Sequence, residues 1–413
     1  MDLLRICSVG SVDDGKSTLI GRLLIDSNKI LADQMESIKL FSEKRGDDYT
    51  DLALLTDGLK AEREQGITID VAYRYFSTNK RKFILVDCPG HIQYTRNMVT
   101  GASNTNLAMV LIDARNGLQE QTRRHCLLAS LLDIPHLVVC VNKMDLVGFS
   151  EETFEKIRQE FEEFSVRLRI KDIEFIPLSA LKGDNVVKKS DSMPWYSGRS
   201  LLEHLESVHV ASDKNLIDFR YPVQRVIRPQ SEKHPDYRAY AGRVSSGAVS
   251  VGERVVVLPS GFKSEVVEIA IGEKRLKEAS AGMSVSLRLK DDIDVSRGDM
   301  IVRENNKPDS LQDLEVLICW LNHEKMLPTK KFIVQHTTRR VKAMVKEILY
   351  KIDVNTLKRS EGVGPFELNE IGRARMRLSG PILADLYKNN RETGSLILID
   401  PDTNVTVAAA III

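Results

Sequence analysis

The sequence predicts an α/β domain, with a mostly parallel sheet and helices on both faces, followed by two β-barrel domains. Three observations predict this fold class. Up to about residue 210, short apolar runs alternate with stretches whose apolar residues have helical spacing. Beyond that point come short runs in which apolar and polar residues alternate, separated by turn residues. The chain of 413 residues is also too long for one ordinary core. We therefore expect three domains, over residues 1–212, 213–308 and 309–413.

The first domain alternates expected strands with expected helices. Strands that alternate with helices form a parallel sheet covered on both faces, and such sheets bind ligands at the carboxyl ends of their strands. The expected strands are Leu4–Val9, Phe83–Val86, Ala108–Ile112, Leu137–Val141 and Phe175–Leu178. The expected helices are Ser17–Asp26, Gln119–Leu132 and Glu151–Leu168.

From about Asp218 the chain consists of short alternating runs punctuated by Gly, Pro and Ser. Regular short strands with turn residues between them are typical of barrels and sandwiches. A second series of this kind runs from about Leu311 to the end of the sequence. The strands expected in the first series are Pro222–Ile227, Ala239–Val244, Glu253–Val257, Val266–Ile269 and Val285–Leu289.

The composition is that of a globular protein. Lys and Arg number 59 and Asp and Glu 58, so the net charge of +1 gives no general field that favours nucleic acid or an anionic membrane. The five cysteines form no C-x-x-C pair, which indicates reduced thiols rather than disulfides or a zinc site. There is no signal-peptide pattern and no apolar stretch of the roughly 18 residues that span a bilayer. We expect a cytoplasmic protein without a membrane or nucleic-acid partner.

The pattern G-x-x-x-x-G-K-[ST], a loop that cradles phosphates at a helix N-terminus, lies between the first expected strand and helix. Its two glycines permit backbone conformations in which successive amides converge on the β-phosphate. Lys16 supplies a cation for the β- and γ-phosphates, and the Ser17 hydroxyl can ligate Mg²⁺. The nucleotide-binding residues expected here are Gly10, Ser11, Val12, Asp13, Asp14, Gly15, Lys16, Ser17 and Thr18.

A second motif, Asp87-Cys88-Pro89-Gly90-His91, follows another expected strand. Asp87 suits a Mg²⁺ ligand, either directly or through water, and Gly90 can offer its amide to the γ-phosphate. The side chain of His91 could orient the attacking water. We include all five residues in the expected nucleotide site.

Thr68, in the segment Gly66-Ile67-Thr68, lies between these two motifs, where its hydroxyl and backbone could close on Mg²⁺ and the γ-phosphate. The candidate catalytic residues are therefore Lys16, Thr68 and His91, and the candidate Mg²⁺ ligands are Ser17, Thr68 and Asp87. No arginine finger can be assigned, and such a group is worth about 10³–10⁵ in rate. We expect slow turnover by the isolated chain and acceleration by a partner.

Two further motifs select the base. In Asn142-Lys143-Met144-Asp145, the carboxylate of Asp145 can accept from both N1–H and the exocyclic amine of guanine, whereas adenine would leave this charge unpaired. The aliphatic part of the Lys143 side chain would pack along the base, and Asn142 would link neighbouring loops of the site. Ser179-Ala180-Leu181 can present a backbone amide to guanine O6. The series predicts a GTPase with GTP and Mg²⁺ as its cofactors.

After the second motif the sequence continues with Tyr94, Arg96-Asn97-Met98 and Thr100-Gly101-Ala102. With these residues the chain resembles the translational GTPase superfamily typified by elongation factor Tu, and two trailing β-domains fit that layout. The resemblance covers essentially the whole chain and is strongest in the first 210 residues.

Further segments resemble the GTPase large subunit of bacterial sulfate adenylyltransferase. In the phosphate loop, Ser11 and Asp14 replace the two histidines typical of elongation factors. The other segments are Gln121–His125, Met193–Gly198, Leu201–Glu203, Asp218–Gln224, Asn389 with Ser395–Asp400, and Asn404–Val407.

This second resemblance implies a function that no single motif shows. GTP hydrolysis by the large subunit would drive formation of adenosine 5′-phosphosulfate and pyrophosphate from ATP and sulfate. That reaction would occur on a smaller ATP sulfurylase catalytic subunit, sulfate adenylyltransferase subunit 2, in a heterodimer or higher assembly. No second phosphate loop follows residue 310, so we expect no fused adenylylsulfate kinase domain.

Two other functions compete with this interpretation. An elongation-factor-like GTPase that binds aminoacyl-tRNA could use Arg339, Arg340, Lys342 and Lys346 to contact phosphates, although a solvated strand face is the commoner explanation of such residues. A stand-alone regulatory GTPase could use the two β-domains to dock a protein effector.

Overall fold

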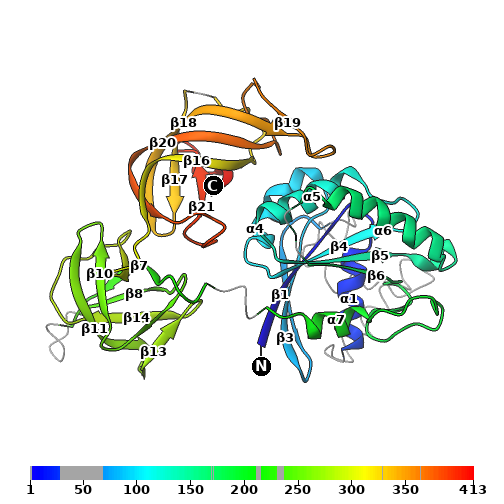
Figure 1. The fold of residues 1–413 in the computed structure, drawn as a ribbon, viewed down its shortest axis with the longest axis horizontal. Helices are drawn as coiled ribbons and strands as arrows, with labels where there is room; N and C mark the ends of the chain where they lie inside the picture. The colour runs from blue at the N-terminus through cyan, green and yellow to red at the C-terminus, as the bar shows by residue number, and fades with distance from the viewer. Residues whose placement is uncertain are drawn as a thin grey trace. The chain divides into compact units, whose positions relative to one another are not determined.

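The computed structural model describes residues 2–27, 68–168, 170, 172–210, 215–229, 237–327, 329–362 and 364–413. The chain divides into two compact units. One comprises residues up to 210 with 354–357, and the other comprises 211–353 with 358–413. Figure 1 shows the α/β elements of the first unit and the β-strands of the second. The predicted fold class is confirmed, while the predicted boundaries at residues 212 and 308 stay a prediction.

The first unit is built on a six-stranded sheet in the order β2-β3-β1-β4-β5-β6, parallel except for β2. All five predicted strands are present, and β4 is buried along its whole length, as its apolar sequence requires. The edge strand β2 was not predicted, because it contains Arg74 and exposes Tyr73 and Tyr75 and so forms no continuous apolar run. The strands are β1 (Asp2–Gly10), β2 (Ala72–Ser77), β3 (Arg81–Asp87), β4 (Leu107–Asp113), β5 (His136–Asn142) and β6 (Asp172–Pro177).

Helices cover both faces of this sheet (Figure 1). Helix α6 buries Phe154, Ile157 and Phe161 at helical spacing, and the Ser150 side chain caps its first turn by accepting from the Thr153 amide at 3.2 Å. Its predicted end at residue 168 is three residues too late. The helices are α1 (Lys16–Asp26), α4 (Thr95–Ala102), α5 (Glu120–Leu131), α6 (Glu151–Ser165) and α7 (Leu201–Ser207), with 3₁₀ turns η2 (Ile92–Tyr94) and η3 (Met144–Val147).

The register of the parallel strands brings the predicted motifs together at the carboxyl-terminal end of the sheet. Ser8 pairs with Asp87, and Asp113 pairs with Asn142. Each motif directly follows the carboxyl end of its strand, so the four motif loops gather where parallel sheets bind ligands.

The second unit contains two barrels. In the first, the strand order β10-β15-β7-β8-β14-β11 is closed by pairing of β10 with β11. The five predicted runs correspond to strands of this barrel, whereas the shorter β9, β12, β13 and β15 were not predicted. The strands are β7 (Arg220–Ile227), β8 (Ala239–Arg243), β9 (Ala248–Ser250), β10 (Arg254–Leu258), β11 (Phe262–Ile271), β12 (Lys274–Leu276), β13 (Glu278–Ser280), β14 (Ser284–Leu289) and β15 (Met300–Arg303).

The second barrel has the order β17-β21-β22-β16-β20-β18 and is closed by pairing of β17 with β18. Within the same unit, Arg220 forms two 2.9 Å bonds with Asp385, and both side chains are largely buried. The strands are β16 (Asp309–Trp320), β17 (Lys331–His336), β18 (Arg339–Ile352), β19 (Arg359–Ser360), β20 (Ile371–Ala384), β21 (Ser395–Ile399) and β22 (Thr406–Ile412).

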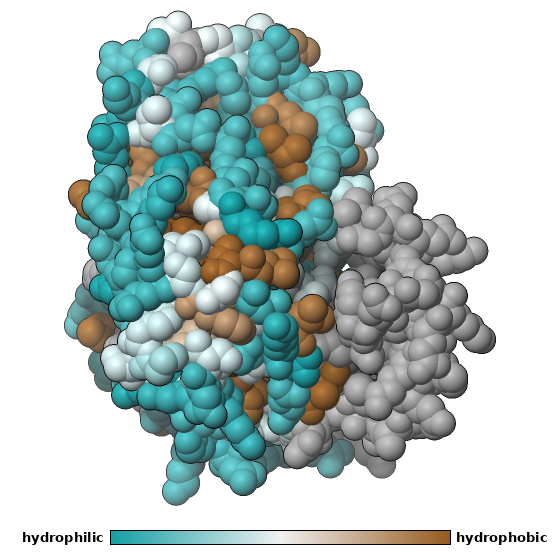
Figure 2. All heavy atoms as spheres, turned by 90° about the vertical axis from the view of Figure 1, so that its right-hand side faces the viewer, coloured by the Kyte–Doolittle hydropathy of each residue, from teal (hydrophilic) through white to brown (hydrophobic). Residues whose placement is uncertain are grey.

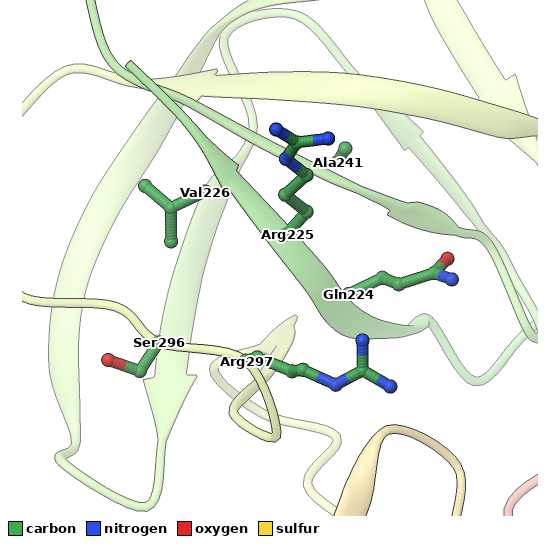
Figure 3. A pocket seen from close by; sticks show the side chains of 6 residues that line it. All are labelled: Gln224, Arg225, Val226, Ala241, Ser296 and Arg297. Carbon is green, nitrogen blue, oxygen red and sulfur yellow. The ribbon is translucent and has the colours of Figure 1, made fainter.

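An open cavity of about 640 Å³ lies on the first barrel (Figure 3). A bulge in β7 between Val223 and Arg225 leaves two consecutive side chains exposed there. None of the predicted site residues lines the cavity; its residues are Gln224, Arg225, Val226, Ala241, Ser296 and Arg297.

The described helices include none that is long and apolar enough to cross a membrane. The face drawn in Figure 2 is mainly hydrophilic, with hydrophobic residues in separate groups.

Candidate nucleotide site

The phosphate loop joins β1 to α1, and two glycines shape it. Gly10 has φ +147° and Gly15 has φ +92°, values that side chains rarely adopt. Space is also lacking, because a Cβ at Gly10 would lie 2.7 Å from the Leu111 carbonyl oxygen, and one at Gly15 would lie 2.4 Å from Nδ2 of Asn142. Both positions therefore require glycine.

Asp14 closes the loop on itself. Its Oδ2 accepts from the Ser11 amide at 2.6 Å, and its backbone carbonyl accepts from Nδ2 of Asn142 at 2.7 Å. Only 2% of Asp14 is exposed. Burial raises the pKa of its carboxyl to about 6, although the Lys16 ammonium opposes the shift. Val12 and Asp13, at the tip of the loop, are exposed.

The Lys16 ammonium is held inside the loop. Its Nζ donates to the carbonyl oxygens of Ser11, at 2.6 Å, and Gly10, at 3.2 Å. Burial lowers the pKa of Lys16, while the nearby Asp14 and Asp87 carboxylates act in the opposite direction. A phosphate that enters the loop would therefore meet a cation already aimed into it.

Three oxygen-bearing side chains meet beside Lys16. Ser17 Oγ lies 3.3 Å from Oδ2 of Asp87 and 3.4 Å from Oγ1 of Thr68. The other carboxylate oxygen of Asp87 accepts from the Ser8 hydroxyl at 2.8 Å, which fixes its orientation. Mg²⁺ is bound through hydroxyl and carboxylate oxygens together with substrate phosphates, so this set fits it. Gly66 and Ile67, which precede Thr68, lie outside the described residues.

Gly90 lies against the phosphate loop. A Cβ there would be 2.4 Å from the Lys16 ammonium and 2.9 and 3.0 Å from the carbonyl oxygens of Ser11 and Gly10. The next residue, His91, caps the N-terminus of η2, and its Nδ1 accepts from the Gln93 amide at 3.4 Å. Its ring lies 5.9 Å from the Tyr94 ring.

The two base-reading loops are joined by Asn142. Its Oδ1 accepts from the Ala180 amide at 2.9 Å, while its Nδ2 holds Asp14. Arg22 of α1 donates to the carbonyl of Ala180 at 3.1 Å and also to that of Leu181. Ser179 closes the turn by accepting from the Lys182 amide at 3.2 Å.

Lys143 is fixed by a residue that we did not predict. Its Nζ lies 2.9 Å from Oδ2 of Asp113, a buried carboxylate that also binds Arg115. Burial disfavours ionisation of Asp113, but hydrogen bonds from Arg115 and Lys143 outweigh it and lower its pKa to about 2. Asp113 ends β4 at the same edge as the motifs, and this position is the signal that could have identified it.

Asp145 differs from Asn142 and Lys143 in the partners of its side chain. No hydrogen bond or ion pair joins its carboxylate to another residue in the described ranges. Met144 beside it is buried. The side chain of Asp145 is therefore available to a ligand, and its role in reading guanine stays a prediction, as do the roles of the other site residues.

Comparisons with known proteins show which families and relatives this chain resembles. The elongation factor Tu GTP-binding domain family matches residues 1–215, and the GTP-eEF1A C-terminal domain-like family matches residues 313–413. A "Bifunctional enzyme CysN/CysC" of Mycobacterium tuberculosis is 56% identical over the full chain, which spans 67% of that relative. One from Rhodopirellula baltica is 52% identical, and the chain spans 63% of it. A "Sulfate adenylyltransferase subunit 1" of Bacteroides fragilis is 52% identical, with all of this chain and 86% of that one covered.

We predict that the Asp145→Asn variant prefers xanthosine triphosphate to GTP. The asparagine amide would present an N–H donor to the C2 substituent of the base. In guanine this substituent is an amine, which is also a donor, whereas in xanthine it is a carbonyl, which accepts. Competition binding with GTP, ATP and xanthosine triphosphate measures the preference. Asp133→Asn, at an exposed position outside the motifs, is the control. A variant at position 145 that keeps guanine selectivity would contradict the assignment.

The charge of Asp14 should give stability a pH dependence. An acid whose pKa is higher in the folded chain favours folding below its ordinary pKa of 3.8, and this contribution is lost as the pH rises through about 6. Asp14→Asn has no such loss, so the difference in free energy of unfolding between this variant and the native chain should rise by about 2 kcal/mol between pH 4 and pH 8.

Urea unfolding of the nucleotide-free protein at several pH values tests this expectation. The exposed neighbour, changed as Asp13→Asn, is the matched control. A difference between Asp14→Asn and the native chain that stays constant over this range would show that burial does not penalise the Asp14 charge.

Proposed function

The chain belongs to the sulfate adenylyltransferase subunit 1 family, within the elongation factor Tu-like GTPases, and we propose that it is the GTP-hydrolysing subunit of a sulfate adenylyltransferase. GTP hydrolysis would drive formation of adenosine 5′-phosphosulfate and pyrophosphate from ATP and sulfate. The observation that carries the proposal is that the relatives match the whole chain, barrels included, and not the GTP-binding domain alone. No observation favours the aminoacyl-tRNA or regulatory alternatives.

The geometry supports a division of work within the site. Lys16 can exchange its two carbonyl partners for phosphate oxygens without leaving the loop. Ser17, Thr68 and Asp87 would hold Mg²⁺, which would supply positive charge to the phosphates. His91 would orient the attacking water, and the Gly90 amide would contact the γ-phosphate.

The proposal requires a partner. Adenylyl transfer would take place on a smaller catalytic subunit, with the two chains in a heterodimer or higher assembly. We also propose a cytoplasmic location, since all five cysteines are free thiols, the form that a reducing compartment maintains.

A tagged copy of the chain, purified from its native host, tests the function. We expect a smaller ATP-using protein to co-purify, and the eluate to release pyrophosphate in a sulfate-dependent reaction that GTP stimulates. Co-purified tRNA without sulfate-dependent activity would support the translation alternative and contradict the proposal.

We predict that His91→Ala lowers kcat for GTP hydrolysis about 100-fold or more, because positioned acid–base groups contribute about 10²–10⁴ in rate. The Kd for GTP should change less than about threefold, since the His91 side chain touches none of the phosphate-loop contacts described above. Single-turnover hydrolysis and nucleotide titration separate the two effects. His209→Ala, at an exposed histidine of the same unit, is the control. An unchanged kcat would remove His91 from the reaction.

A further inference from the structure

Helix α5 contacts the phosphate loop through two side chains that have no part in the function proposed above. His125 Nδ1 accepts from the Gly10 amide at 3.2 Å. One turn earlier, Thr122 Oγ1 lies 3.2 Å from the hydroxyl of Ser11. Both α5 side chains are fully buried. Two consecutive loop residues, Gly10 and Ser11, are thus contacted by side chains of α5.

The bond to Gly10 requires a neutral imidazole. A backbone N–H can only donate, so Nδ1 must keep its lone pair, and a protonated ring would present N–H at both nitrogens. The surroundings keep the ring in this form, because burial and then the charges of Lys16 and Arg124 lower the pKa of His125 to about 3. The bond should therefore persist throughout the physiological pH range.

The two loop residues bound by α5 are the two that hold Lys16. Their carbonyl oxygens accept from its ammonium, and the same two oxygens would lie within 3.0 Å of a Cβ on Gly90. A shift of the Gly10–Ser11 backbone would thus move both the phosphate-binding cation and the residue expected to contact the γ-phosphate. Gly10 has a φ of +147°, and the bond that its amide donates to His125 helps to hold it there.

We propose that His125 is a positioning residue for nucleotide binding, which orients the Gly10–Ser11 backbone and thereby Lys16. Thr122 assists through Ser11. The inference rests on the nucleotide site of the proposed function but not on sulfate activation. The competing explanation is a buried histidine that merely fills the core behind the loop. A positioning residue can be replaced only by a side chain with an acceptor at the place of Nδ1, whereas a core-filling residue needs only a side chain of similar volume.

A pair of amide variants separates them. In His125→Asn the side-chain oxygen can lie near the position of Nδ1, whereas in His125→Gln it reaches toward the position of Nε2, next to Gln121. Both variants bury one amide, so a core-filling role predicts that they behave alike or that the longer Gln is tolerated better. A positioning role predicts that only Asn keeps the contact with Gly10.

The measurement is the Kd of the full chain for GTP and for GDP, by titration of nucleotide-free protein. We expect His125→Asn to stay within about threefold of the native Kd, and His125→Gln and His125→Leu to weaken binding about tenfold or more, because a buried backbone donor is left unpaired. Thr122→Val should weaken binding by a smaller factor. Cys126→Ala, at the next buried position of α5, should lower the melting temperature without changing Kd.

Each outcome bears on the proposal. Equal Kd values for the Asn and Gln variants, or a native-like Kd for Leu, would overturn the positioning role. If Leu does not fold, the Asn–Gln comparison still decides, since both place a polar group at the same site. Failure of the native chain to bind GTP would contradict the proposed function itself, and this control is measured first.

Discussion

The side-chain amide of Asn142 is the interaction on which the nucleotide site depends. Its nitrogen donates to the Asp14 carbonyl in the phosphate loop, and its oxygen accepts from the Ala180 amide in the last motif. One planar group thus sets the distance between the part of the site that would hold phosphates and the part that would hold the base. Its burial is possible because both ends of the amide are paired.

This link forms only because the parallel sheet brings the loops together. The sequence patterns predicted the strands at residues 4–9, 83–86, 108–112, 137–141 and 175–178, and the structure has a strand at each. Continuous apolar runs identify strands that are buried on both faces, which is the environment of a central parallel strand. An edge strand such as β2 does not have that environment, so this criterion cannot detect it.

The residues that support the site were harder to predict than the residues that line it. Motif spacing identifies groups that would touch GTP, but Asp113 and His125 act through Lys143 and Gly10, and their partners lie 30 and 115 residues away in the sequence. Such contacts depend on the packing of α5 and the register of β4, which local sequence does not encode. The short barrel strands β9, β12 and β13 escaped prediction for a related reason, since three residues contain too little periodicity.

The phosphate loop also shows why two departures from the elongation-factor pattern belong together. Position 14 carries a carboxylate, which accepts from the Ser11 amide and adds a negative charge beside Lys16. Position 11 carries a hydroxyl small enough to contact Thr122 of α5. Asp14 therefore ties the loop to itself while Ser11 ties it to the helix that carries His125. The loop of this chain thus holds Lys16 through contacts within the protein. Replacing Asp14 would leave the Ser11 amide without its acceptor, whereas replacing Ser11 would remove the hydroxyl that faces Thr122.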